Sequence, residues 1–245
     1  MALFESEALI LRTYNLAEAD KIVVCLTRGF GLIRGVAKGA RKLKNRFGAA
    51  LEPFTLVKLT YYHNETRELV NLRQAEILRS YFKLSSDATV LTGLSYMGDL
   101  LVDFSPPHQS NDLLFRMVTA CLEALAPSDL QGVLRYFEIW LLKIEGFLPD
   151  LHCCADCQRP LANENIILGP DFVLRCRKCA PAGTRLMSKP LHAQLRATEK
   201  LSPAKFAEQW RDVTAPTSRE LAELTHQLIG RVLERLPRVR PVFIQ

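Results

Sequence analysis

KIVVCLTRGFGLIRGVAKGARKLKNRFGAAL, residues 21–51, is the stretch that decides the fold, and it contains no acidic residue. Its first half has two short runs, residues 21–27 and 32–37, in which apolar and β-branched side chains recur as they do in half-buried strands. The four residues between these runs include two glycines, which is typical of a tight turn. The first half of the stretch therefore predicts a β-hairpin.

The second half of the stretch, residues 38–48, places five cations within nine residues and has glycines near both ends. It lacks sustained apolar periodicity, so it predicts a loop. Each Lys or Arg laid against a phosphate releases condensed counterions, which makes a cationic loop beside a small sheet suitable for a polyanion. A solvated loop is the alternative. The absence of nearby acidic residues favours nucleic acid, and so do the interleaved Phe30 and Phe47, whose rings could stack on bases.

The composition is that of an ordinary globular protein, with 48% hydrophobic and 24% charged residues in a chain of 245. The N-terminus has no basic and apolar leader, and no apolar run reaches the length of a membrane span, so a cytoplasmic location is expected. Charge is segregated along the chain: the net charge is +5 over residues 1–80, −5 over 81–150 and +6 over 151–245. This segregation favours separate surfaces for separate partners.

Residues 1–80 predict a small β-barrel. Five short apolar runs with β-branched and aromatic side chains are separated by turn-forming residues. A five-stranded, partly open barrel of this size is typical of an OB-fold, whose sheet face and loops commonly bind single strands. The expected strands are residues 4–11, 21–27, 32–37, 54–62 and 69–73.

The apolar period changes to that of helices after Ser85. Ser128 with Gln131, and Thr217 with Glu220, are spaced as capping boxes that would open two of these helices. The helices on either side of a cysteine-rich insert are expected to form one bundle. The expected helices are residues 85–104, 111–125, 128–144, 190–201, 203–210 and 217–236.

The chain is therefore predicted to be an α+β protein with an N-terminal OB-fold barrel and a helical domain that carries an insert. The predicted boundaries are 1–80 for the barrel, 81–149 and 183–245 for the two parts of the helical domain, and 150–182 for the insert.

Two Cys-x-x-Cys pairs, separated by eighteen residues, give the insert the spacing of a four-thiolate zinc ribbon: Cys154, Cys157, Cys176 and Cys179. Two such turns present four sulfurs to one ion. Disulfides are the alternative, and a cytosolic setting argues against them. The signature of catalytic zinc deaminases is absent, so structural zinc is predicted. Cys153 and His152 adjoin the first pair and stay open as substitute ligands. Four nearby cations would offset the charge of a zinc tetrathiolate: Arg159, Arg175, Arg177 and Lys178.

The sequence has no recognisable catalytic motif. Phosphate-binding glycine loops and the Gly-x-Ser-x-Gly elbow are absent, which favours a binding protein over an enzyme. Asp99 and Asp103 stand four residues apart and could aim two carboxylates at one metal, as in a zinc-supported nuclease or transferase. A solvated acidic helix face explains the same spacing more simply.

Several segments resemble the RecO family of bacterial recombination mediators: residues 18–23 (EADKIV), 36–42 (VAKGARK), 51–54 (LEPF), 146–149 (GFLP) and the two cysteine pairs. The resemblance covers most of residues 5–180 and is weaker after 190. It implies an OB-fold, a helical domain and a zinc insert, without catalysis. It also implies binding to single- and double-stranded DNA, annealing of strands coated by single-strand-binding protein, and assistance to RecA loading together with the ring-forming partner RecR.

By position, this resemblance assigns the phosphate contacts to the cationic loop. Arg34, in the expected strand of residues 32–37, is a further candidate for a phosphate contact. An RNA- or ribosome-associated zinc-ribbon protein is the competing hypothesis, since OB-folds and basic loops serve RNA equally well. The candidate DNA-binding residues are Arg34, Lys38, Arg41, Lys42, Lys44 and Arg46.

Overall fold

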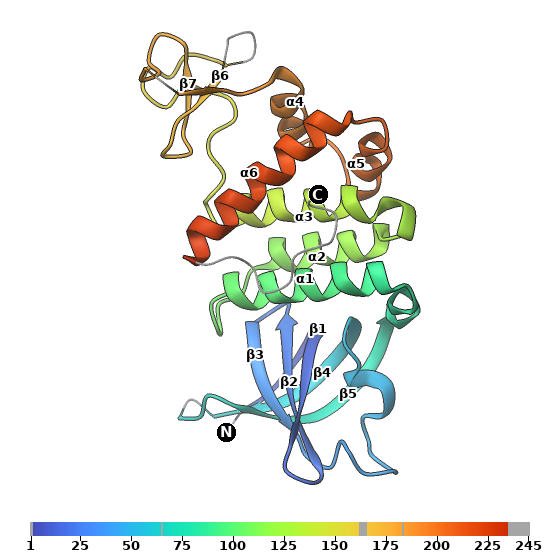
Figure 1. The fold of residues 1–245 in the computed structure, drawn as a ribbon. Helices are drawn as coiled ribbons and strands as arrows, with labels where there is room; N and C mark the ends of the chain where they lie inside the picture. The colour runs from blue at the N-terminus through green and yellow to red at the C-terminus, as the bar shows by residue number, and fades with distance from the viewer. Residues whose placement is uncertain (1, 65, 162–165, 183, 235–245) are drawn as a thin grey trace. The chain divides into compact units, whose positions relative to one another are not determined.

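The computed structural model describes residues 2–64, 66–161, 166–182 and 184–234. The chain divides into two compact units, Met1–Thr119 and Ala120–Gln245, which we describe separately. Figure 1 shows the barrel strands of the first unit in blue to cyan and the last helix of the second unit in red. No helix in the described ranges combines the length and the apolar composition needed to cross a membrane.

The first unit contains the predicted OB-fold as a closed barrel with the strand order β1-β2-β3-β5-β4. Every neighbouring pair is antiparallel except β3 and β5, which run parallel. The predicted strands and the hairpin turn at residues 28–30 are confirmed. The strands are β1 (Ala2–Leu16), β2 (Asp20–Thr27), β3 (Gly31–Ala37), β4 (Thr55–His63) and β5 (Val70–Ser80).

Two strands are longer than the sequence predicts, and their length closes the barrel. The first half of β1 pairs with β4 and its second half with β2, with a register shift between Ile10 and Arg12. Such a shift bends a strand and lets it serve two neighbours. The far end of β5, from Arg73 to Ser80, is largely exposed, so it carries no clear apolar alternation for sequence analysis to detect.

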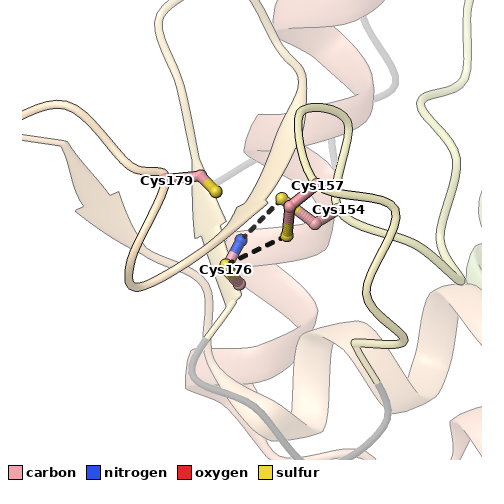
Figure 2. A group of neighbouring side chains, drawn as sticks. All are labelled: Cys154, Cys157, Cys176 and Cys179. Carbon is pink, nitrogen blue, oxygen red and sulfur yellow. Dashed lines mark hydrogen bonds between the residues drawn. The ribbon is translucent and has the colours of Figure 1, made fainter.

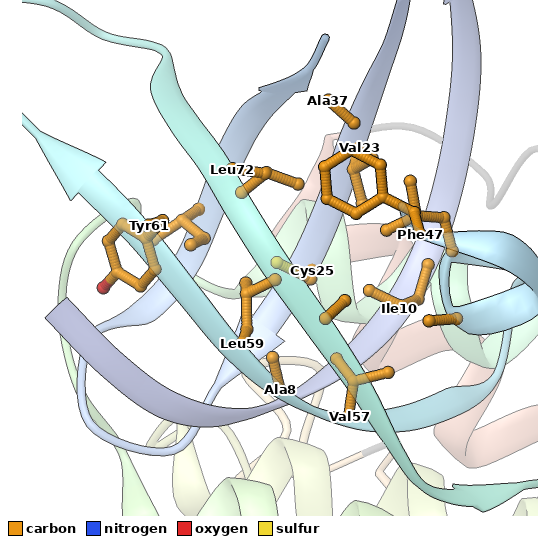
Figure 3. Packing of buried hydrophobic residues seen from close by; sticks show 14 of the residues in the cluster. Ala8, Ile10, Val23, Cys25, Ala37, Phe47, Val57, Leu59, Tyr61 and Leu72 are labelled. Carbon is orange, nitrogen blue, oxygen red and sulfur yellow. The ribbon is translucent and has the colours of Figure 1, made fainter. Parts of the chain in front are cut away.

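The barrel interior is filled by alternate side chains of all five strands, as Figure 3 shows for the labelled strand residues. Phe47, near the end of the cationic loop, also enters this core and is only 3% exposed. Gly35 on β3 is required by packing, because a Cβ there would lie 2.6 Å from the Leu72 side chain. Replacing this glycine would push β3 away from β5.

Helix α1 (Ala88–Phe104) belongs to the same compact unit as the barrel. It begins at Asp87, whose side chain accepts hydrogen bonds from the backbone N–H groups of Thr89 and Val90. Buried Asp99 forms an ion pair with Arg12 of β1, while Asp103 is exposed. The Asp99 carboxylate therefore joins α1 to the barrel. The prediction that Asp99 and Asp103 could bind one metal ion together is not supported, because Asp99 already has Arg12 as its partner.

The second unit is a helical bundle that carries a small three-stranded sheet of order β7-β6-β8. Helix α3 packs against α5 and α6, and α4 packs against α6, so segments before and after the insert share one bundle, as predicted. Helix α2 (Asp112–Ala124) spans the division between the units. The other elements are α3 (Leu130–Ile144), β6 (Ile166–Leu168), β7 (Leu174–Cys176), β8 (Arg185–Leu186), α4 (Lys189–Ala197), α5 (Pro203–Trp210) and α6 (Ala215–Leu233).

Both predicted capping boxes are wrong. Ser128 lies in a 3-10 turn before α3, and its hydroxyl donates to Asp129 instead of capping the helix. The N-cap of helix α6 is Thr214, three residues before the predicted Thr217, and the helix has a proline in its first turn. Proline's fixed backbone angle suits that position. Thr217 is consequently buried inside the helix, and Glu220 accepts a hydrogen bond from Ser188.

Candidate nucleic-acid interface and candidate metal centre

The start of the cationic loop, directly after β3, is hydrogen-bonded to the turn between β1 and β2 and to the first residue of β2. Gly39 has a φ of +72°, a conformation that favours glycine. Its N–H donates to Asp20 Oδ1 at 2.8 Å, and the N–H of Arg41 donates to the carbonyl of Ala19 at 2.9 Å. The start of the loop is therefore fixed to the barrel.

The end of the loop is closed by Asn45. Its Oδ1 accepts hydrogen bonds from the N–H groups of Phe47 at 3.0 Å and Gly48 at 2.8 Å. Its Nδ2 donates to the carbonyl of Lys42 at 3.1 Å. Because Phe47 is buried in the barrel, the loop tip, residues 42–44, is held between two anchored ends.

The candidate DNA-binding residues are all exposed at the surface of this unit. Arg41 donates to the carbonyl of Ala17 at 2.7 Å, and Arg46 donates to the carbonyl of Leu72 at 3.3 Å. A guanidinium has five N–H donors, so both arginines keep donors for a ligand. Among the described residues, none of the six candidates forms an ion pair with a carboxylate: Arg34, Lys38, Arg41, Lys42, Lys44 and Arg46.

Three other cations of the same unit are neutralised by carboxylates. Arg12 pairs with Asp99, Arg28 with both Glu7 and Asp112, and Lys58 with Glu5. The hydrogen bond that Arg28 donates to Asp112 is the main reason that the pKa of Arg28 lies above its ordinary value. The loop and β3 thus gather six exposed cations that have no carboxylate partner among the described residues, and this local positive charge attracts a polyanion.

The predicted stacking role of the phenylalanines is wrong for Phe47, because its ring lies in the barrel core. Phe30 is half-buried and packs edge-on against Phe4 at 4.8 Å and Tyr61 at 5.9 Å between ring centres. Sequence analysis overlooked Leu43, which the structure exposes completely at the tip of the loop. Its only sequence signal is a single apolar residue between two lysines.

The two cysteine pairs meet in the second unit. The Sγ atoms of Cys154, Cys157, Cys176 and Cys179 all lie within 4.8 Å of one another (Figure 2). The Sγ atoms of Cys157 and Cys176 are 3.8 Å apart. Sulfurs at the corners of a tetrahedron around zinc, with Zn–S bonds of about 2.3 Å, are separated by about 3.8 Å. Four thiols in this arrangement are compatible with zinc binding.

Backbone N–H groups prepare the first cysteine for metal binding. The N–H of Cys176 donates to Cys154 Sγ at 3.3 Å. Burial raises the pKa of Cys154, but hydrogen bonds from the backbone of Cys157, Cys176 and Asp156 outweigh it and lower the pKa to about 6. Hydrogen bonds to Cys157 and Cys176 instead raise the pKa of Cys179 to about 12. The cluster thus stabilises one thiolate before any ion binds, and thiolates are the form that binds zinc.

The residues beside the cluster have other partners. His152 Nε2 lies 3.0 Å from a carboxylate oxygen of Glu199, outside the group of four sulfurs. Cys153 is likewise outside that group and forms a backbone bridge with Pro160. Arg175 binds carboxylates of Asp156 at 3.0 Å and Asp171 at 2.8 Å, so its charge is already compensated. The predicted role of Arg175 in offsetting zinc-thiolate charge is therefore weakened.

The comparison with known proteins covers nearly the whole chain. The family model described as Recombination protein O N terminal matches residues 1–81, and the model described as Recombination protein O C terminal matches residues 85–241. The chain is 34% identical over 233 residues to DNA repair protein RecO of Koribacter versatilis, with 94% of each chain covered. It is 30% identical over 249 residues to the protein of that name from Syntrophus aciditrophicus, covering 95% of this chain and 92% of the relative.

Proposed function

Because this chain belongs to the RecO family of recombination proteins, we propose that it acts in DNA repair as a DNA-binding recombination mediator. In this proposal residues 1–80 form the DNA-binding domain, and residues 81–149 with 183–245 form a helical domain that carries the zinc-binding insert, residues 150–182. The protein assists repair by binding and positioning DNA, without catalysing a reaction of its own.

The observation that carries the DNA-binding role is the uncompensated charge of the anchored loop. Arg12, Arg28 and Lys58 of the first unit are paired with carboxylates, whereas the cations of the loop are exposed and have no carboxylate partner among the described residues. Phosphates on a bound strand would replace the missing carboxylates and release counterions. The proposed phosphate contacts are Arg34, Lys38, Arg41, Lys42, Lys44 and Arg46.

Strand annealing follows from the same charge. Two complementary strands repel each other through their phosphates. A protein that neutralises one strand while leaving its base edges accessible lowers that repulsion, and the step needs no nucleotide hydrolysis. Both single and double strands would bind, because the contacts are made to phosphates, which carry no base information.

Zinc would be held by Cys154, Cys157, Cys176 and Cys179 and would have a structural role. The closed set of four sulfurs leaves no open position for a substrate. Cys154 and Cys176 are both buried, Cys176 in β7 of the small three-stranded sheet, and this supports the role, since the described part of the insert has few other buried side chains to stabilise it.

The family resemblance extends the proposal to partners. The protein would act on strands coated by single-strand-binding protein, work together with RecR, and thereby assist RecA loading. These interactions rest on family membership.

The test is annealing of two complementary oligonucleotides, one carrying a fluorophore and the other a quencher. We expect the full-length protein to accelerate quenching of bare strands and of strands coated with single-strand-binding protein, equally with and without ATP. No acceleration over the spontaneous rate, or a strict need for ATP, would overturn the proposal. Tighter binding to matched RNA than to DNA strands would instead support the RNA-associated alternative.

A further inference from the structure

Leu43 is the most exposed large apolar side chain described in the structure. Its relative exposure is 104%, whereas the next most exposed, Phe82, reaches 61%. Full burial of a leucine side chain is worth about 1.5–3 kcal/mol. A single exposed leucine needs no explanation by itself. The surroundings of Leu43 give it a functional interpretation.

The loop presents Leu43 to solvent instead of folding it onto the barrel. The bond from Asn45 Nδ2 to the carbonyl of Lys42 closes the turn that contains Leu43. Hydrogen bonds at Gly39 and Arg41 fix the opposite end. Leu43 therefore stands at the tip of an anchored turn with a cation directly on each side, Lys42 and Lys44.

We propose that Leu43 is a wedge that inserts between two neighbouring bases of the bound DNA strand. Lys42 and Lys44 would contact the phosphates on either side of the opened step. Apolar side chains, leucine among them, open base steps in this way in other DNA-binding proteins. This inference rests on the proposed function, because it requires the loop to bind DNA.

Insertion has an energetic signature that phosphate contacts lack. Separating two stacked bases costs a few kcal/mol, and the cost is least in single strands and at flexible pyrimidine–purine steps. The gain comes from burying an apolar side chain, which releases no counterions. Leu43 should therefore add affinity that is independent of salt and should favour single strands over duplexes.

The test uses a single-stranded oligonucleotide that contains 2-aminopurine, whose fluorescence rises when it loses stacking. We expect the wild-type protein to increase this fluorescence and Leu43→Ala to abolish most of the increase. Leu43→Ala should also weaken binding, by less than about 10-fold, because the variant loses the burial of the leucine but also avoids the cost of unstacking; the dependence on salt should be unchanged. Leu43→Phe should retain the fluorescence signal, and Leu43→Lys should lose it despite the added cation.

The matched control is Leu186→Ala, which removes a leucine that is 56% exposed outside the loop; it should change neither fluorescence nor affinity. Thermal unfolding should be the same for the wild type and the Leu43 variants, because Leu43 has no packing to lose. If Leu43→Ala bound DNA tightly, with the usual dependence on salt, and gave the wild-type fluorescence increase, the proposal that Leu43 inserts between bases would be refuted. The proposed DNA binding by the loop would still hold. An absence of DNA binding by the wild-type protein would refute the proposed function itself.

Discussion

The guanidinium carbon of Arg46 lies 5.0 Å from the centre of the Phe47 ring. The Phe47 ring is buried in the barrel core, and Arg46 lies at the surface and also donates to the carbonyl of Leu72. One cation of the proposed DNA-binding loop is thus positioned by a core residue. Stability of the barrel and geometry of the loop are consequently linked.

Phe47→Ala should destabilise the first unit and displace the end of the loop. Removing a buried phenylalanine typically costs about 3–5 kcal/mol, because it leaves a cavity as well as losing apolar burial. Urea denaturation would measure the loss. The control Phe82→Ala removes an exposed ring of the same unit and should cost less than about 0.5 kcal/mol. Equal losses for the two variants would contradict the core position of Phe47.

Replacing Arg41, Lys42, Lys44 and Arg46 by alanine should weaken binding to all DNA sequences alike. Each phosphate contact to a single strand contributes about 0.7 to the slope of log affinity against log salt, so the slope should fall by about 3. Fluorescence anisotropy at 50 to 200 mM salt would measure it.

A control for this variant makes the same change in net charge on the second unit: Lys189, Lys200, Lys205 and Arg219 replaced by alanine. These four side chains are also exposed. The control variant should retain most of the wild-type slope of log affinity against log salt. If it lost as much slope as the loop variant, binding would depend on overall charge and not on the loop.

The protein should contain one zinc ion per chain, which elemental analysis would measure. The double variant Cys154→Ser, Cys176→Ser should lose the ion and unfold the insert locally, because metal binding and folding of such an insert are coupled. Its DNA affinity should stay close to that of the wild type. Cys153→Ser is the matched control and should keep full zinc occupancy, since Cys153 lies outside the cluster. Zinc in the double variant would contradict the assignment.

Glu138→Ala should strongly destabilise the second unit. Glu138 is 1% exposed, pairs with Arg135 at 2.8 Å and accepts a hydrogen bond from Thr225 at 2.5 Å. Removing the carboxylate leaves the guanidinium of Arg135 buried without its counter-charge, which costs about 3–5 kcal/mol. Chemical denaturation of this variant beside Glu123→Ala, a substitution of an exposed glutamate, would measure the difference. A small loss at Glu138 would mean that water or another group compensates Arg135.

Glu199 should make the second unit more stable at neutral than at acidic pH. Partial burial raises its pKa, but hydrogen bonds from Lys143 and His152 outweigh burial and keep the pKa below its ordinary value of 4.5. A carboxyl with a lowered folded pKa adds stability above its unfolded pKa and loses it as the pH falls through the folded value. Glu199→Gln should therefore lower stability at pH 7 by less than about 1 kcal/mol. That difference should disappear at acidic pH, as the pH falls below 4.5 and through the lowered folded pKa. Thermal unfolding across this pH range would test it.

The sequence by itself determined the barrel, the helical segments and the group of four cysteines. Apolar periodicity is a local property, so it identified the hairpin of β2 and β3 and the helices on both sides of the insert. The Cys-x-x-Cys spacing is also local, and it identified all four sulfurs that the structure brings within 4.8 Å. The cluster of loop cations was visible because charge is read directly from residue type.

Only the tertiary structure decided which of these residues are free to act. Sequence analysis could not tell that Phe47 fills the barrel, that Asp99 pairs with Arg12, or that Arg175 is held by Asp156 and Asp171. It also could not distinguish exposed Leu43 from a core leucine. Burial and ion pairing depend on segments far apart in the chain, and their effect is decided only when folding brings those segments together.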